Sequence, residues 1–360
     1  MNLALLGGML FGLLPLPMNA QATFAPARPT SSINIFAHLH HLRTIGSTVD
    51  SANGDQNPYG LVIANATTSK IAKGDLIACN FNDKANIQGN GTTIEVLHPF
   101  PGAKSHRLVA DPSLKGCAAI ALGPMNDIWL AAYTANDNPI VSPEGQIFTT
   151  LLNGPWHGPF GQAFSGHPGP DGVAAFYESN ALDGSIIRIN IRSNGPFTYD
   201  KIVAGLDVNH GVPGSILTPS GLTYDASRDT LYIIDGNDVG RVYAISQVSS
   251  VRPNGITVSS KTDQCFFGPD ARFGRQVFHG PPLNAPISAD LLFNGDLVIG
   301  NTLDNRLVQL SPNGRVMGVL NVDRGPDGAL FGIATQGTTA DNTRIYLNDD
   351  NDNTIKVLAH

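Results

Sequence analysis

Cysteine is scarce in this sequence. The 360 residues include three cysteines, Cys79, Cys117 and Cys265, without a Cys-x-x-Cys pair or a cysteine and histidine spacing typical of zinc. An odd count permits at most one internal disulfide. Cys79 and Cys117 fall in neighbouring sequence units and could pair, but small buried thiols fit the sequence equally well. The scarcity excludes a disulfide scaffold and a cysteine-based metal centre.

Charged residues are also few, at 14% of the chain, with a formal net charge of -7. No block of Lys and Arg is present to follow a phosphate backbone, so nucleic acid is not an expected partner. A G-x-S-x-G nucleophile elbow and a phosphate-binding glycine loop are likewise missing. The acidic stretch 349–353 lacks the Gly and Glu of a calcium loop, and an Asn/Asp-rich hairpin turn accounts for it better.

Long apolar runs are missing except at the start. Residues 1–22, MNLALLGGMLFGLLPLPMNAQA, are apolar and end in Ala20-Gln21-Ala22, a pattern that predicts a secretory signal cleaved before Thr23. The usual Lys or Arg at the start is missing, so either the signal is atypical or the true start lies upstream. A membrane anchor is the alternative, but the run is short of the roughly 20 residues that a spanning helix needs. We therefore expect a secreted or periplasmic protein with no membrane span in the mature chain.

Glycine (39) and proline (25) are abundant, well above their usual combined share of roughly 12%. No window has the period and composition of a long helix, so the chain is expected to be rich in strands and turns. One unit recurs: two short apolar strands on either side of a polar turn. It is found at 76–97, 127–151, 176–189, 232–245, 298–310 and 345–358. Four of its turns are centred on Gly184, Gly240, Asn305 and Asn353, which are one four-stranded unit apart.

A second element precedes each unit: a turn and then a short apolar strand. Six such units predict an all-β, six-bladed β-propeller of four-stranded antiparallel blades around a central channel. We assign 23–44 to an N-terminal linker and 45–360 to the propeller. The last unit lacks an outermost strand, which residues 41–49 could supply to close the ring. A pair of β-sandwiches is the competing architecture, but sandwiches carry no unit repeat.

The repeat resembles a known family. VIGNTLDNRLVQLSPNGRV (298–316) is similar to the NHL repeat, in which a hydrophobic strand precedes an Asn-Arg turn and a later Pro-x-Gly turn. The block NFND...NIQGNGTTI within 80–94 resembles secreted bacterial six-bladed NHL-type proteins of unassigned function. The resemblance spans about residues 45–360 and implies the propeller fold. It departs at His157, where an acidic residue is expected after Trp156, and in the longer linker 258–282.

Ligands of propellers collect around the channel, so we examined the positions just before the innermost strands. Tyr59, Trp156, His157, Ser220 and Phe331 are the predicted ligand-binding residues. Trp156 and Tyr59 could stack on a sugar or peptide, although blade-seam packing is a common use of such aromatics. His157 is the candidate base if the protein is an enzyme, with a structural role as the alternative.

A metal is considered at the same level. Enzymes of the gluconolactonase type share the six-bladed shape and hold calcium in the channel through carboxylate and Asn oxygens. Asn57 and Asn284 are the residues here that could serve such an ion. The sequence thus favours a monomer that binds a small molecule, glycan or peptide at one channel face. The alternatives are a calcium- or zinc-dependent lactonase, esterase or lyase at that mouth, and a scaffold for an envelope protein.

Overall fold

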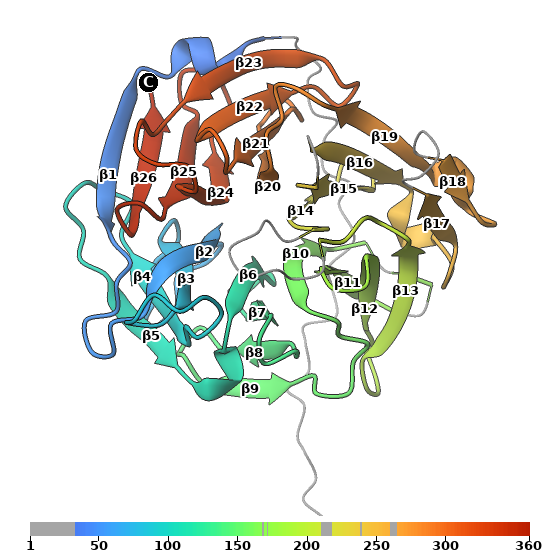
Figure 1. Cartoon of the computed structure of the whole chain (residues 1–360). Coiled ribbons are helices and arrows are strands. Elements are labelled where there is room, and N and C mark those ends of the chain that lie inside the picture. The colour runs from blue at the N-terminus through green and yellow to red at the C-terminus, as the bar shows by residue number, and fades with distance from the viewer. Residues whose placement is uncertain (1–32, 168, 171, 210–217, 238–239, 260–264) are drawn as a thin grey trace, which may run out of the picture.

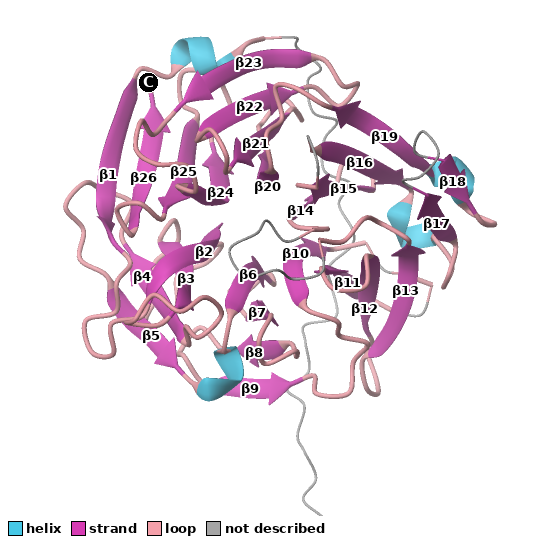
Figure 2. Cartoon of the chain, viewed as in Figure 1, coloured by secondary structure: helices cyan, strands magenta, loops and turns pink. Residues whose placement is uncertain are grey.

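Each sequence unit folds into one blade. The computed structural model describes residues 33–360 except 168, 171, 210–217, 238–239 and 260–264, so the predicted signal and the first part of the linker lie outside the described residues. Six separate sheets stand as a ring around a central channel (Figure 1). Strands and loops make up nearly all of this described part (Figure 2). The six-bladed β-propeller prediction is confirmed.

The first three blades are built from the following strands. Blade one contains β2 (Gln56–Ile63), β3 (Leu76–Asn82), β4 (Thr93–Leu97) and β5 (His106–Ala110); blade two contains β6 (Cys117–Leu122), β7 (Ile128–Ala132), β8 (Pro139–Val141) and β9 (Ile147–Thr150); blade three contains β10 (Pro159–Ser165), β11 (Ala174–Asn180), β12 (Ser185–Ile191) and β13 (Thr198–Ala204). In each blade the first-named strand lines the channel and the last lies at the rim (Figure 1).

The other three blades follow the same order. Blade four contains β14 (Leu222–Asp225), β15 (Thr230–Asp235), β16 (Arg241–Ser246) and β19 (Gly274–His279); blade five contains β20 (Pro286–Leu291), β21 (Leu297–Asn301), β22 (Arg306–Leu310) and β23 (Val316–Asn321); blade six contains β24 (Leu330–Gln336), β25 (Arg344–Asp349), β26 (Thr354–Ala359) and β1 (His41–Ser47). Short 3-10 turns complete the described elements: η1 (Ile35–His38), η2 (Pro112–Leu114), η3 (Val248–Ser250) and η4 (Ala271–Phe273).

The ring is closed by its two ends. β1 pairs antiparallel with β26, from His41 opposite Ala359 to Ser47 opposite Thr354. An N-terminal strand therefore completes the C-terminal blade, as the sequence predicted for residues 41–49. Closure covers the edge of β26, which would otherwise present unpaired backbone groups.

The turns between the second and third strands use the residues that the repeat singled out. Gly184, Gly240, Asn305 and Asn353 have φ values of 67°, 85°, 51° and 53°. This left-handed conformation is easy for glycine and tolerated by asparagine, which explains why the repeat carries these two residue types there.

One blade is larger than the repeat predicts. Between β16 and β19 the chain leaves blade four and forms β17 (Ile256–Ser259) and β18 (Cys265–Phe267). β17 pairs parallel with β13, so blade three becomes a six-stranded sheet. The long linker 258–282 that departs from the family pattern covers the end of this excursion and continues through β19.

The core lies between the blades rather than at one centre. β3, β7 and β21 are buried over their whole lengths, because both faces of a blade pack on its neighbours. The seam between blades one and two also carries a disulfide between Cys79 and Cys117, whose Cα atoms are 5.9 Å apart. Of the two possibilities that the sequence left open for these cysteines, the structure contains the paired one.

Candidate functional site

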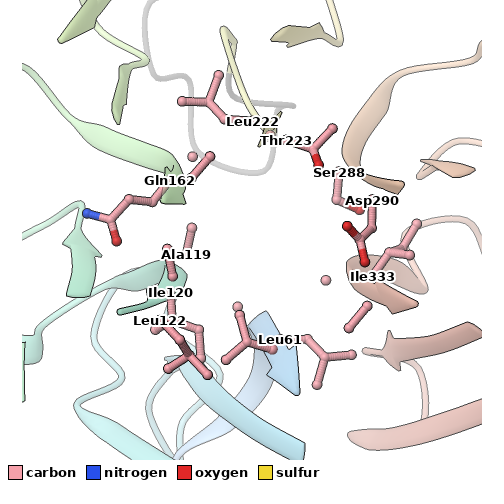
Figure 3. A pocket seen from close by; sticks show the side chains of 18 of the residues that line it. Leu61, Ala119, Ile120, Leu122, Gln162, Leu222, Thr223, Ser288, Asp290 and Ile333 are labelled. Carbon is pink, nitrogen blue, oxygen red and sulfur yellow. The ribbon is translucent and has the colours of Figure 1, made fainter. Parts of the chain in front are cut away.

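The channel contains a cavity of about 610 Å³ lined by the innermost strands of all six blades. Aliphatic side chains form part of its walls beside polar groups, and Figure 3 shows Leu61, Ile120, Leu122, Leu222 and Ile333 around it. A volume of several hundred cubic ångströms with both kinds of group in its lining is typical of sites for small molecules. This cavity is the candidate functional site.

A constriction bounds the cavity on the side where the innermost strands begin. Three of these strands carry a glycine at this level, Gly60, Gly161 and Gly332, and Gly221 precedes β14 at the same level. A Cβ on Gly161 would lie 2.0 Å from the carbonyl oxygen of Ser220, and one on Gly332 would lie 2.4 Å from that of Tyr59. Neighbouring strands therefore approach each other so closely here that only glycine fits.

Aromatic rings pack across the channel at this constriction. Tyr59 is stacked between Phe81 and Phe331, with ring centroids 4.2 and 3.9 Å away, and meets Phe160 edge-on at 6.0 Å. These rings come from blades one, six and three, and all are buried. Burial raises the pKa of the Tyr59 hydroxyl, and the charge of Asp350 adds to the shift. The aromatic cluster thus forms an apolar floor for the cavity.

Polar side chains from several blades also line the wall: Asn65, Lys73, Gln162, Thr223, Tyr224, Ser288, Asp290, Thr335 and Gln336. The carboxylate of Asp290 turns toward the cavity from blade five (Figure 3). Its oxygens accept hydrogen bonds from the backbone N–H of Thr335 at 2.7 Å and of Leu291 at 2.8 Å, which fix its position. Ser288 and Thr223 lie on the same side, and the hydroxyl of Ser288 donates to the carbonyl oxygen of Phe331. The exposed Lys73 also contributes to the lining.

Gln162 lines the cavity with its backbone and stem, but its amide points away from it (Figure 3). The amide nitrogen donates to the Glu178 carboxylate at 3.0 Å. Glu178 is fully buried, and burial raises its pKa well above the usual range. A buried carboxyl group therefore lies directly behind the cavity wall, between blades two and three.

Two of the predicted ligand-binding residues reach the cavity. Tyr59 and Phe331 line it, but their faces are stacked on each other and their exposed fractions are both 8%. They contribute to the floor of the cavity rather than to an open stacking surface.

The other three predicted ligand-binding residues lie outside the lining. Trp156 is buried in the apolar seam between blades two and three, where its Nε1 donates to the carbonyl oxygen of Leu151 at 2.5 Å. His157 is exposed, and its backbone N–H donates to Asn180 Oδ1 at 3.0 Å. Ser220 is fully buried, with its hydroxyl donating to the carbonyl oxygen of Ile234 at 3.1 Å.

The two predicted metal ligands also lie outside the lining. Asn57 is buried, its N–H donates to Asn353 Oδ1 at 2.7 Å, and its own Oδ1 has no hydrogen-bond partner within the described part of the chain. Asn284 is half-buried, and its carbonyl oxygen accepts from the N–H of Leu303 at 3.4 Å. Over the described residues no three His, Cys, Asp or Glu side chains form a metal-binding group. Calcium takes six to eight oxygen ligands, and these two amides supply only two. Calcium at Asn57 and Asn284 stays a prediction.

Sequence reasoning missed the cavity wall because it examined positions ahead of each innermost strand. Of these positions Tyr59 and Phe331 line the floor, but most of the wall is formed by residues after the glycine, such as Leu61 and Ile333. A signal was present: Tyr59-Gly60, Phe160-Gly161 and Phe331-Gly332 repeat an aromatic residue followed by glycine. That repeat marks the constriction and could have placed the wall.

Fold and site together define a six-bladed β-propeller with a small-molecule-sized cavity bounded by an aromatic floor. No protein-family model matches the chain, and no curated protein matches its sequence. No helix in the described residues is long and apolar enough to cross a membrane.

Solved structures do match. A gluconolactonase from Xanthomonas campestris aligns with a TM-score of 0.54 at 13% identity, over 93% of this chain and 97% of that one. A catalytically inactive variant of virginiamycin B lyase from Staphylococcus aureus with quinupristin aligns with a TM-score of 0.51 at 13% identity, over 89% and 100%. At this identity the similarity shows the shared fold and carries no residue roles.

Proposed function

We propose that this protein binds a small molecule with an apolar body and a group that donates hydrogen bonds or carries positive charge. The observation that carries the proposal is the cavity, where aliphatic side chains and the carboxylate of Asp290 line the same wall. The aliphatic side chains favour the body of such a ligand, and a fixed carboxylate favours a donor or cation and sets its orientation.

Among the classes that the sequence left open, this geometry supports a small molecule over a glycan or a peptide. A sugar face stacks on an exposed aromatic ring. Tyr59 and Phe331 instead stack on each other, and Trp156 is buried in a blade seam. An extended peptide needs a groove with open backbone groups, whereas this site is a cavity within the channel.

The test uses two fluorescent probes that share a dansyl body. Dansylcadaverine carries a primary amine, and dansylglycine carries a carboxylate. We expect the amine probe to bind at least tenfold more tightly, Asp290→Asn to remove this preference, and Ala119→Trp, which fills the cavity, to abolish binding of both. Lys104→Ala, at an exposed position outside the lining, is the matched control. Equal binding by the Ala119→Trp variant and the unmodified protein would refute the cavity as the site.

The alternative from the sequence is a metal-dependent lactonase, esterase or lyase, with His157 as base and Asn57 and Asn284 as metal ligands. It is supported by the fold shared with a gluconolactonase, and its residues lie outside the lining of the cavity. A screen of lactones and esters with added calcium or zinc distinguishes the two proposals. Turnover that is lost in His157→Ala but kept in Ala119→Trp would establish the alternative.

We further propose that the protein is exported to the periplasm or medium and acts as a monomer. The Cys79–Cys117 disulfide supports export, because such bonds persist in oxidising compartments. Mass spectrometry of protein secreted from cells should find Thr23 as the first residue, and size-exclusion chromatography with light scattering should give one chain per particle. A cytoplasmic product with an intact N-terminus would contradict export.

A further inference from the structure

A cluster of buried polar side chains lies in the seam between blades two and three. Asn138 Nδ2 and Gln162 Nε2 both donate to the same oxygen of Glu178, Oε2. Gln162 and Glu178 are directly opposite each other on β10 and β11, while Asn138 comes from blade two, just before β8. Three side chains from two blades therefore meet at one point.

Asp137, which precedes Asn138 and whose charge acts on Glu178, belongs to the same cluster. Four oxygens of these residues have no hydrogen-bond partner among the described residues: Glu178 Oε1, Gln162 Oε1, Asn138 Oδ1 and Asp137 Oδ1. The exposed fractions of these residues are 0% for Glu178 and Asn138, 6% for Gln162 and 7% for Asp137. Leaving a buried acceptor unpaired costs about 1 to 3 kcal/mol. Four unpaired acceptors in one place indicate that a cation or a hydrogen-bond donor binds there.

Among the described residues, no other side chain hydrogen-bonds these four oxygens. The charge of Glu178 reaches the hydroxyl of Tyr199, where it adds to burial in raising the pKa. The seam is apolar, with Trp129 and Ile140 from blade two and Ile187 from blade three. No ion pair among the described residues joins Glu178 or Asp137 to a basic side chain. The nearby charge of Asp137 instead adds to the effect of burial in raising the pKa of Glu178. A single proton on Glu178 would satisfy one oxygen of the four.

We infer that Asp137, Asn138, Gln162 and Glu178 form a binding site for a hard divalent cation, calcium by its chemistry. Two carboxylates and two amide oxygens are the ligand types that calcium takes, and the two formal charges match that of the ion. Each amide reaches Glu178 Oε2, so a half-turn of the amide brings its oxygen beside that carboxylate. Magnesium keeps several waters in its shell, which suits a site this deeply buried less well.

The cavity supplies a path for the ion. Gln162 lines the cavity with its stem while its amide forms part of the cluster, so it separates the two. Rotation of this one side chain would connect the cavity with the seam. The inference is independent of the proposed ligand, since it rests on the unpaired oxygens and not on the apolar wall.

The first measurement is metal content and thermal melting. After purification without chelator and dialysis against metal-free buffer, we expect about one calcium per chain. EDTA should lower Tm, and restored calcium at 100 times its dissociation constant should raise Tm by about 5 °C. Glu178→Gln should remove this response, whereas Asp296→Asn, in a comparable buried cluster of blade five, should keep it.

A second readout does not depend on a difference in stability. Terbium occupies calcium sites and luminesces when excited through a nearby tryptophan, and Trp129 and Trp156 both lie in this seam. Terbium luminescence should rise in the unmodified protein, fall on calcium addition, and require at least tenfold more terbium in Asp137→Asn. Absence of a calcium-dependent Tm shift together with no sensitised luminescence would overturn the inference. So would an undiminished response in Glu178→Gln.

Discussion

Two buried clusters in this molecule each join one carboxylate to two side-chain amides, but among the described residues only one of them has hydrogen-bond partners for its amide oxygens. In blade three, Glu178 accepts from the amides of Asn138 and Gln162; in blade five, Asp296 accepts from those of Asn294 at 3.0 Å and Gln309 at 2.7 Å. All six side chains are buried. The amide oxygens of the first cluster have no partner, whereas those of the second are occupied.

Backbone groups account for the difference. Asn294 Oδ1 accepts from the N–H of Asp296 at 3.1 Å, and Gln309 Oε1 accepts from the N–H of Ile35 at 2.8 Å. Gln309 Nε2 also donates to the carbonyl oxygen of Ile33 at 2.8 Å. The segment before β1 therefore completes the Asp296 cluster. The Glu178 cluster lies between two blades, where no backbone group of the described residues reaches its unpaired oxygens, and an external cation is the complement that we propose.

The largest loss of stability is expected from removing the segment that completes the Asp296 cluster. A chain that starts at Thr48 loses both backbone partners of Gln309 and the β1–β26 ladder. We expect Tm to fall by more than about 10 °C, or folding to fail, because the edge of β26 is exposed and the ring is open. Circular dichroism melts against the chain that starts at Thr23 would measure this. A change below 2 °C would show that ring closure contributes little.

A single substitution separates the two clusters with less disruption. Gln309→Ala removes the partners of Ile35 and Ile33 and one donor of Asp296, so it should reduce the free energy of unfolding by about 3 kcal/mol. Gln162→Ala removes a hydrogen bond but also a buried oxygen that has no partner, so in EDTA it should reduce the free energy of unfolding by about half as much. Urea unfolding of both variants in EDTA gives the comparison. Equal costs would mean that the unpaired oxygen carries no penalty.

The next prediction sharpens the comparison through pH. Burial raises the pKa of Glu178 well above its usual value, and burial raises that of Asp137 to about 6. Without calcium, the folded state then binds more protons than the unfolded state above pH 4.5, so stability falls as pH rises. Calcium must displace these protons. The gain in Tm on adding calcium should therefore be small at pH 5 and largest near pH 8, and a gain that shrinks as pH rises would argue against ionised Glu178 as a ligand.

The fold could be predicted from the sequence because each blade repeats the same short pattern of apolar strands and polar turns. Short stretches of sequence are enough to predict the left-handed turns at Asn305 and Asn353 and the strand at 41–49 that closes the ring. The candidate site could not be predicted in the same way. The wall residues follow a constriction that exists only once Gly161 and Gly332 meet neighbouring strands, and the Glu178 cluster joins Asn138 to a residue 40 positions away on another blade.

The smallest effect concerns a third buried carboxyl group, Glu95 on β4, which differs from the other two because a salt bridge lies beside it. Burial raises the pKa of Glu95 to about 8, and hydrogen bonding to Asp50 adds to the shift, while Arg107 binds Asp50 and opposes it. The folded state keeps a proton here that the unfolded state loses near pH 4.5, so stability is fully present below that pH and is lost as pH rises to 8. Gln carries a permanent N–H donor in place of this proton, and Glu95→Gln should therefore flatten the fall in Tm between pH 5 and pH 8 by a few degrees. Arg107 already places a positive charge beside Glu95, so no calcium ion is expected to bind there. The flattening should therefore be the same with calcium and with EDTA, which distinguishes this carboxyl group from Glu178.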